Sequence, residues 1–176
     1  FKKEQLPPQD IEAEQSVLGS LLIDKDAIVK VADIVAPKDF YRKAHEMIFD
    51  AMVGLYAKSE PIDLLTVSSR LKEKKQFKEI GGMSYLTTLV NSVPTASNII
   101  HYAKIVSQKR TLRDLIGASY EISSLAWEEN KDIDEIIDEA EKKIFSVSQS
   151  SLISEFQHIK PYLGEAFERF DRLHKG

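Results

Sequence analysis

The stretch Asn98–Trp127, NIIHYAKIVSQKRTLRDLIGASYEISSLAW, decides the fold. Apolar residues recur in it at helical spacing, with Gly117 as its one glycine and no proline to interrupt the pattern. At about 1.5 Å per residue such a helix is roughly 40 Å long, more than a small bundle needs to cover itself. The turn ENKD follows, and Asp132 with Glu135 resembles a capping box that begins a second helix. The sequence therefore predicts a helical hairpin over residues 98–149.

Both helices of this hairpin are expected to have wide apolar faces. From Ile133 to Val147 apolar residues recur at spacings of three and four, and the longer helix has a second apolar face of its own. Two antiparallel helices cannot cover such faces all round. Either the hairpin folds back on residues 10–93, or it pairs with a second copy as a four-helix dimer interface, which we favour. The expected interface residues are Leu112, Leu115, Ile116, Ile122, Leu125, Ile133, Ile136, Ile137, Ala140 and Ile144.

Residues 1–97 are expected to form a compact bundle of helices. Asp10 is the expected N-cap of the first helix, and Asp63 that of the fourth. The first expected helix begins after Pro8, the second covers about residues 26–35, and the third covers about residues 40–57. The fourth begins at Asp63, and the fifth lies between Gly82 and Pro94. The expected buried residues include Ile11, Leu18, Leu21, Leu22, Ile28, Val31, Ile34, Val35, Ala44, Ile48, Met52, Leu55 and Tyr56.

Residues 150–176 are expected to hold a linker and a docking helix. The serine-rich stretch VSQSSLISEFQH, residues 147–158, loses the apolar stripe and is typical of a linker. Apolar residues then recur at helical spacing, and a helix of this length is marginal without a surface to dock on. That surface is either its own bundle or another domain or subunit, which we favour. The expected docking stripe is Leu163, Ala166, Phe167, Phe170 and Leu173.

Composition excludes several classes of protein. Hydrophobic residues make up 43% and charged residues 30%, and no apolar run approaches the roughly 18 residues of a membrane span. The formal net charge is −4, from 24 basic and 28 acidic residues, so the chain as a whole does not attract nucleic acid. There is no cysteine and no apolar stretch typical of a secretory signal near the N-terminus, which favours a cytoplasmic location.

No catalytic, metal-binding or cofactor-binding motif is present. Neither GxxxxGK[ST] nor GxGxxG occurs, so no phosphate-binding loop is expected. HEMIF resembles the zinc motif HExxH, but Phe49 stands where the second histidine is needed, so we expect His45 to be a partly buried hydrogen-bonding residue. The lysine-rich run KEKKQFK, interleaved with acids, is typical of a solvated helix end. This chain is therefore not expected to be an enzyme on its own.

Five segments together resemble a known family. They are LPPQDIEAEQSVLGSLLID (6–24), DFYRKAHEMIFDAM (39–52), PIDLLTVSSRL (61–71), GGMSYLTTLVNSVPTASNIIHYAKIV (81–106) and EAFERFDRLHKG (165–176). Their order and spacing are similar to those of the amino-terminal domain and linker of the bacterial replicative DNA helicase, the DnaB family. The resemblance covers the chain from Leu6 to Gly176.

The resemblance implies a role in assembly. In that family hairpins pair, three pairs form a collar above a ring of six ATPase domains, and the linker helix docks on the neighbouring subunit's ATPase domain. The collar recruits primase, and the full-length enzyme encloses single-stranded DNA and unwinds duplex 5′ to 3′ with ATP. The ATPase domain, for which ATP and Mg are expected, is not part of this sequence.

Three other interpretations are open from the residues alone. A stand-alone helical adaptor of the primosome, of primase-binding or helicase-loader type, would have the same helices and no ATPase domain. A helix-turn-helix DNA-binding protein would use the bundle, although the acidic balance argues against it. A metal-dependent hydrolase built on His45 lacks its second ligand.

Overall fold

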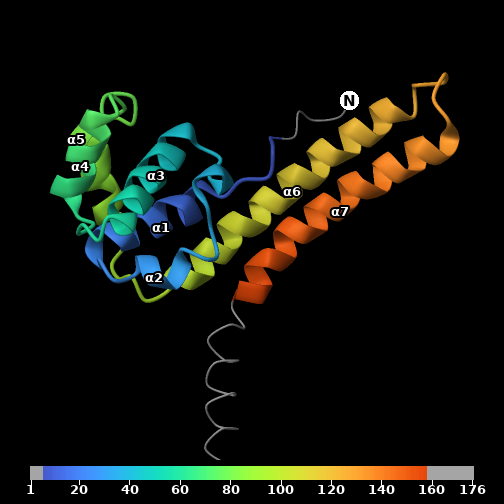
Figure 1. The fold of residues 1–176 in the computed structure, drawn as a ribbon. Coiled ribbons are helices and arrows are strands. Elements are labelled where there is room, and N and C mark those ends of the chain that lie inside the picture. The colour runs from blue at the N-terminus through green and yellow to red at the C-terminus, as the bar shows by residue number, and fades with distance from the viewer. Residues whose placement is uncertain (1–5, 158–176) are drawn as a thin grey trace, which may run out of the picture. The chain divides into compact units, whose positions relative to one another are not determined.

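The computed structural model describes residues 6–157, with side chains described as far as Gln149 (Figure 1). Within these residues every regular element is a helix, which confirms the predicted all-α fold. The elements are α1 (Ile11–Ile23), α2 (Ile28–Val31), the short 3-10 helix η1 (Pro37–Asp39), α3 (Lys43–Ala57), α4 (Leu64–Glu73), α5 (Gly82–Asn91), α6 (Ile99–Leu125) and α7 (Ile133–Gln157).

The chain divides into two compact units, and the division falls inside α6. The first unit, the bundle, extends to Arg113, and the second, the hairpin, begins at Asp114. The division predicted from the sequence lies earlier, at residue 97. The first turns of α6 belong to the bundle because Ile99 and Ala103 are 1% and 0% exposed in its core.

Close contact between α1 and α5 shapes the core of the bundle. A Cβ atom on Gly19 would lie 2.2 Å from the carbonyl oxygen of Leu89 and 2.5 Å from Cγ2 of Val93. Both distances are shorter than atoms tolerate, so only glycine allows α1 to approach α5 this closely. On the neighbouring positions of α1, Leu18 and Leu21 are fully buried, as predicted.

The second and third helices are shorter than predicted, although most of their expected core residues are buried. α2 covers only Ile28–Val31, yet Ile34 and Val35 just beyond it are buried. α3 begins at Lys43 instead of residue 40, and Phe40 before it packs on Phe49 with ring centroids 4.9 Å apart. The prediction that Tyr56 is buried was wrong. It is 44% exposed, because it lies one residue past Leu55 and therefore off the buried side of α3.

The prediction of a linker over residues 147–158 was also wrong for most of its length, because α7 continues to Gln157. Serine is only mildly unfavourable in a helix, and no glycine or proline interrupts this stretch. Two serine hydroxyls bond to carbonyls of the preceding turn, and such bonds destabilise a helix only slightly, so they do not end α7. Ser146 donates to the carbonyl of Lys143 (2.7 Å) and Ser148 to that of Ile144 (3.3 Å).

A buried polar network connects α1, α3 and α5. The carboxylate of Glu14 accepts hydrogen bonds from the backbone N–H groups of Tyr41 (2.6 Å) and Arg42 (3.4 Å). It also lies 2.5 Å from Nδ1 of His45, whose Nε2 lies 2.6 Å from the hydroxyl oxygen of Tyr85 on α5. Glu14 is 2% exposed and His45 is 0% exposed. His45 is therefore a hydrogen-bonding residue, as predicted, but it is fully buried.

This network also holds the backbone that leads into α3. Arg42 is the N-cap residue of α3, and its side chain makes no capping hydrogen bond. The carboxylate of Glu14 accepts from Arg42 and from Tyr41 before it, at the helix end where the backbone dipole favours negative charge. A buried carboxylate is costly unless it is hydrogen-bonded, and here two backbone N–H groups donate to it and the His45 ring lies against it.

We expect Glu14→Ala to lower the free energy of unfolding of the bundle by about 3 to 5 kcal/mol, because breaking one partner of a buried pair leaves the others unsatisfied. Urea denaturation followed by circular dichroism measures this change. The matched control is Glu12→Ala, which removes an exposed carboxylate from the same turn of α1 and should cost less than about 1 kcal/mol. Equal losses for the two variants would contradict the role of the network.

Candidate interaction surface

The hairpin turn is held by a lysine. Nζ of Lys131 lies 2.6 Å from a carboxylate oxygen of Glu139 and 3.8 Å from one of Glu128. The hydrogen bond to Glu139 raises the pKa of Lys131, and the same bond lowers the pKa of Glu139. Asp132 caps α7 by accepting from the backbone N–H of Asp134 at 2.9 Å, which confirms the predicted cap but not Glu135 as its capping-box partner. The turn and the first turns of α7 are therefore tied together.

α6 and α7 contact each other along one side of each helix. Lys143 on α7 forms an ion pair with Glu121 on α6. Ala118 and Leu125, both on α6, are each only 8% exposed. From Asp114 onward α6 lies antiparallel to α7 (Figure 1). These contacts form the predicted hairpin and use one side of each helix.

Most of the expected interface residues are exposed in the single chain. Leu125 is the exception, since it is buried. Ile122, Ile136 and Ala140 are half-buried. The exposed residues, with their exposed fractions, are Leu112 (45%), Leu115 (45%), Ile116 (43%), Ile133 (66%), Ile137 (50%) and Ile144 (44%). The hairpin thus leaves much of the predicted apolar surface uncovered.

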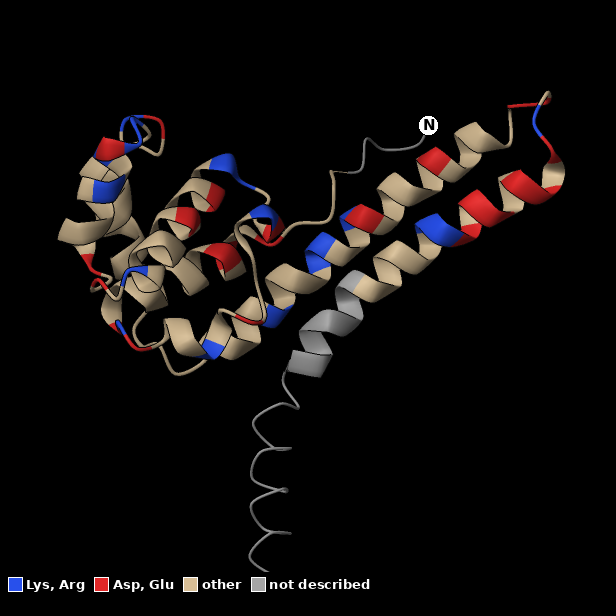
Figure 2. Cartoon of the chain, viewed as in Figure 1, with Lys and Arg blue, Asp and Glu red and all other residues tan. Residues whose placement is uncertain are grey.

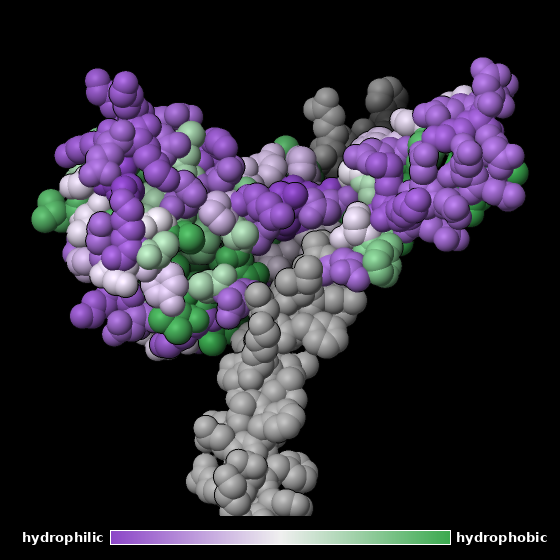
Figure 3. All heavy atoms as spheres, in the orientation of Figure 1, coloured by the Kyte–Doolittle hydropathy of each residue, from purple (hydrophilic) through white to green (hydrophobic). Residues whose placement is uncertain are grey.

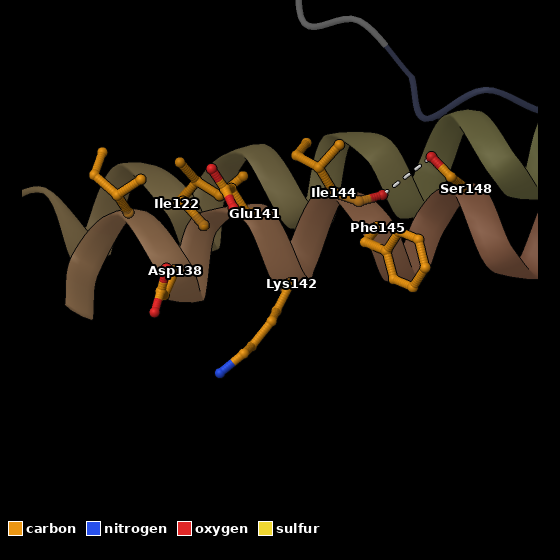
Figure 4. Close-up of a pocket in the computed structure, with 9 residues that line it drawn as sticks. Ile122, Asp138, Glu141, Lys142, Ile144, Phe145 and Ser148 are labelled. Atoms are coloured by element: carbon orange, nitrogen blue, oxygen red, sulfur yellow. Dashed lines mark hydrogen bonds between the residues drawn. The ribbon is translucent and has the colours of Figure 1, made fainter. Parts of the chain in front are cut away.

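Four of the ten expected interface residues line one open groove of about 800 Å³ on the hairpin (Figure 4). They are Ile122, Ile137, Ala140 and Ile144. Figure 4 shows Ile144 and Ser148 on one side of α7, and Asp138 and Lys142 on the opposite side. The residues lining the groove are Ile122, Ile137, Asp138, Ala140, Glu141, Lys142, Ile144, Phe145 and Ser148. An open apolar groove of this kind is suited to receiving apolar side chains from another protein surface.

The sequence analysis missed one large residue of this groove. Phe145 is 61% exposed and directly follows Ile144. It was missed because it lies at the edge of the stripe with spacings of three and four. Two further aromatic residues of the hairpin, Tyr120 and Trp127, are 72% and 80% exposed, and the sequence pattern gave no prediction for them. The aromatic residues themselves were the signal in the sequence that could have pointed to this surface, since aromatic side chains are frequent at interfaces.

Charge is unevenly distributed along the hairpin. Figure 2 shows acidic residues gathered near the hairpin turn, at the start of α7. They include Asp132, Asp134, Glu135 and Asp138. Negative charge at a helix N-terminus is favoured by the helix dipole, so these carboxylates stabilise α7. The acidic segment overlaps the groove at Asp138, and Glu141 and Lys142 also line it, so charged side chains border its apolar residues.

Apolar side chains also reach the surface of the bundle, where Figure 3 shows green areas on the face in view. Leu65 on α4 is 72% exposed, and Val29 on α2 is 63% exposed. Single exposed apolar residues are normal on protein surfaces. Leu65 is therefore a useful reference for the exposed residues of the hairpin.

The predicted docking residues Leu163, Ala166, Phe167, Phe170 and Leu173 lie outside the described residues. Within the described part of the chain, no group of three or more His, Asp or Glu side chains is placed to hold a metal ion. None of the helices in that part combines the length and the hydropathy needed to cross a membrane.

Comparison with known proteins gives consistent similarities. The family model described as "DnaB-like helicase N terminal domain" matches residues 6–108. The replicative DNA helicase DnaB of Geobacillus stearothermophilus is 43% identical over 171 residues, and the replicative DNA helicase DnaC of Bacillus subtilis (strain 168) is 42% identical over 171 residues. Each alignment covers 97% of this chain but only 38% of the relative. The chain therefore spans about two fifths of their length.

Two solved structures are similar to this one. The N-terminal domain of DnaB helicase from Mycobacterium tuberculosis is 43% identical, with a TM-score of 0.76 over 80% of this chain and 99% of that chain. A DnaB-like replicative helicase, described together with its interactions with primase, is 26% identical, with a TM-score of 0.67 over 86% of this chain and 35% of that chain.

We expect the Lys131–Glu139 pair to give the hairpin a stability that depends on pH. The pKa of Glu139 is lowered, so its contribution is full above its ordinary value of 4.5 and is lost as the pH falls through the lowered value. The pKa of Lys131 is raised, so its contribution is full below its ordinary value of 10.5 and is lost as the pH rises through the raised value.

Thermal melting of Lys131→Gln and of the unsubstituted chain, followed by circular dichroism across this range, measures the effect. The variant should melt slightly lower at neutral pH, and the difference should vanish at both extremes. Lys104→Gln, on the exposed surface of α6, should show no such pattern. A difference that is constant from acid to alkali would contradict the role of the pair.

Proposed function

The chain belongs to the family of DnaB-like helicase N-terminal domains, and from this premise we propose that it is the assembly region of a replicative DNA helicase. In this role it holds copies of the protein together by pairing their hairpins. The exposed apolar groove around Ile137, Ile144 and Phe145 is the observation that carries the proposal. Such a groove is unfavourable in water and becomes favourable when a second copy covers it.

Pairing of identical hairpins accounts for the position of this surface. A contact between two copies related by twofold symmetry uses the same patch on both, so the patch has to be apolar and self-complementary. The groove offers Ile122 from α6 and Ile137 from α7 on one face of the hairpin. Two such faces together would form a four-helix bundle with a common core.

Unwinding activity is proposed for a longer polypeptide that contains this chain. The proposal is supported by the relatives, which are named replicative DNA helicases and are more than twice as long as the stretch they share with this chain. In that polypeptide an ATPase domain using ATP and Mg would drive movement along single-stranded DNA and separate duplex 5′ to 3′. Three pairs of hairpins would form the collar of a hexamer. This activity takes place in the cytoplasm.

Primase is the proposed partner of the collar. The proposal is supported by similarity to a DnaB-like replicative helicase whose solved structure is described with its interactions with primase. That similarity covers 86% of this chain, so it includes the bundle and the hairpin. Recruiting primase to the collar would place primer synthesis next to the unwound strand.

We expect Ile137→Asp combined with Phe145→Asp to weaken self-association of the chain by roughly 100-fold or more, because charge at the centre of an apolar interface is not solvated when the interface closes. Sedimentation and light scattering over a range of concentrations measure the change. The unsubstituted chain should form dimers in these measurements.

Leu65→Asp combined with Val29→Asp is the matched control, since it places the same two charges on apolar residues that are 72% and 63% exposed on the bundle. It should leave the dimer unchanged. A chain that is monomeric at all concentrations, or a double variant that pairs as well as the unsubstituted chain, would contradict hairpin pairing.

The C-terminal stripe with Phe167 and Phe170 is proposed to dock on the ATPase domain of the neighbouring subunit. In the longer polypeptide, Phe167→Asp combined with Phe170→Asp should therefore shift hexamers to smaller assemblies at low protein concentration. Native mass spectrometry and ATP hydrolysis at several concentrations test this. Arg169→Ser, in the same segment but off the apolar stripe, serves as the control. A double variant that stays hexameric and active at low concentration would exclude the docking role.

A further inference from the structure

α6 passes from the bundle to the hairpin as one unbroken helix, and a glycine lies next to that passage. The boundary between the two compact units falls between Arg113 and Asp114, and Gly117 follows within the next helical turn. A glycine in the interior of a helix costs up to about 1 kcal/mol relative to alanine. A residue that costs stability in this way needs a reason.

Packing does not provide that reason. A Cβ atom added to Gly117 would meet nothing within 4 Å, in contrast to Gly19, whose Cβ would collide with α5. The helical conformation does not provide it either, because any residue adopts the backbone angles of α6 and Gly117 is not among the glycines with positive φ. What glycine offers at this position is a weaker and more flexible helix.

A neighbouring side chain weakens the same turn further. The hydroxyl of Ser119 donates a hydrogen bond to the backbone carbonyl of Ile116 at 2.7 Å. Such a bond competes with the helix's own hydrogen bonds and often bends a helix. Sharp bends in helices also occur at combinations of glycine and serine. Two features that favour bending therefore lie within four residues of each other.

The helix is held firmly on both sides of this turn. Before it, the guanidinium of Arg113 donates to the backbone carbonyls of Pro8 (2.7 Å) and Asp39 (2.5 Å), which fixes α6 to the bundle. After it, Glu121 forms an ion pair with Lys143, which fixes α6 to α7. Gly117 lies midway between these two attachments. Any bending of α6 would therefore concentrate in the turn between them.

We propose that Gly117 is a hinge in α6, which allows the bundle to change its orientation while the hairpin stays intact. The hinge does not depend on hairpin pairing, because both attachments lie within one chain. In an assembled protein it would let each bundle adjust to its partners without breaking the contact made by the hairpin. Hinges of this kind absorb a conformational change in a few residues.

Distances measured between two spin labels test the hinge directly. The chain contains no cysteine, so Ser69→Cys on α4 and Asp134→Cys, at a position of α7 that does not line the groove, provide two specific labelling sites, both exposed. Labelled chains diluted with unlabelled chain give only distances within one molecule. The unsubstituted background should give a broad distribution that contains a bent population. In the Gly117→Ala background that population should fall about fivefold, because alanine favours the straight helix.

Gly54→Ala is the matched control. Gly54 lies inside α3, and its added Cβ would also meet nothing within 4 Å, so the control gains the same helix propensity away from the hinge. It should leave the distance distribution unchanged. The hinge is wrong if Gly117→Ala leaves the distribution as broad as before, if the unsubstituted background already gives one narrow distance, or if Gly54→Ala narrows it equally.

Discussion

Two antiparallel helices can bury only one side of each helix against the other, and the hairpin is limited by this constraint. The inner side of α6 is used by Ala118 and Leu125, and the ion pair of Glu121 with Lys143 fixes it to α7. Apolar residues outside that side have nothing in the hairpin to cover them. The remaining surface therefore follows from the number of apolar positions in these helices, and it is the physical basis of the proposed assembly role.

Periodicity predicted what depends on residues close together in sequence. It gave the hairpin, the caps at Asp10, Asp63 and Asp132, and most of the bundle core, since each follows from spacing or from a local hydrogen bond. Periodicity failed where the apolar stripe of a helix weakens although the helix itself continues. The serines of residues 146–154 dilute the apolar stripe of α7, but the helix continues because nothing there breaks it.

Periodicity could not predict the buried network, because its members are far apart in sequence. Glu14 and His45 are 31 positions apart, and Tyr85 lies a further 40 positions on. A glutamate in the first turn of a helix is well explained by the helix dipole alone, so Glu14 gave no sign that it is buried. Only the fold brings the carboxylate to the uncapped N-terminus of α3. Phe145 was missed for the opposite reason, since its surroundings are local but its position is at the edge of a stripe.

The bundle and the hairpin depend on each other through a single helix. The first turns of α6 pack into the bundle core with Ile99 and Ala103, so the core holds the base of the helix that forms the groove further along. The polar network of Glu14 holds together the helices around that base. Helices in contact only with each other would have a weak base, because a pair of helices has little core of its own. A stable bundle is therefore what allows the hairpin to keep so much apolar surface exposed and available to a partner.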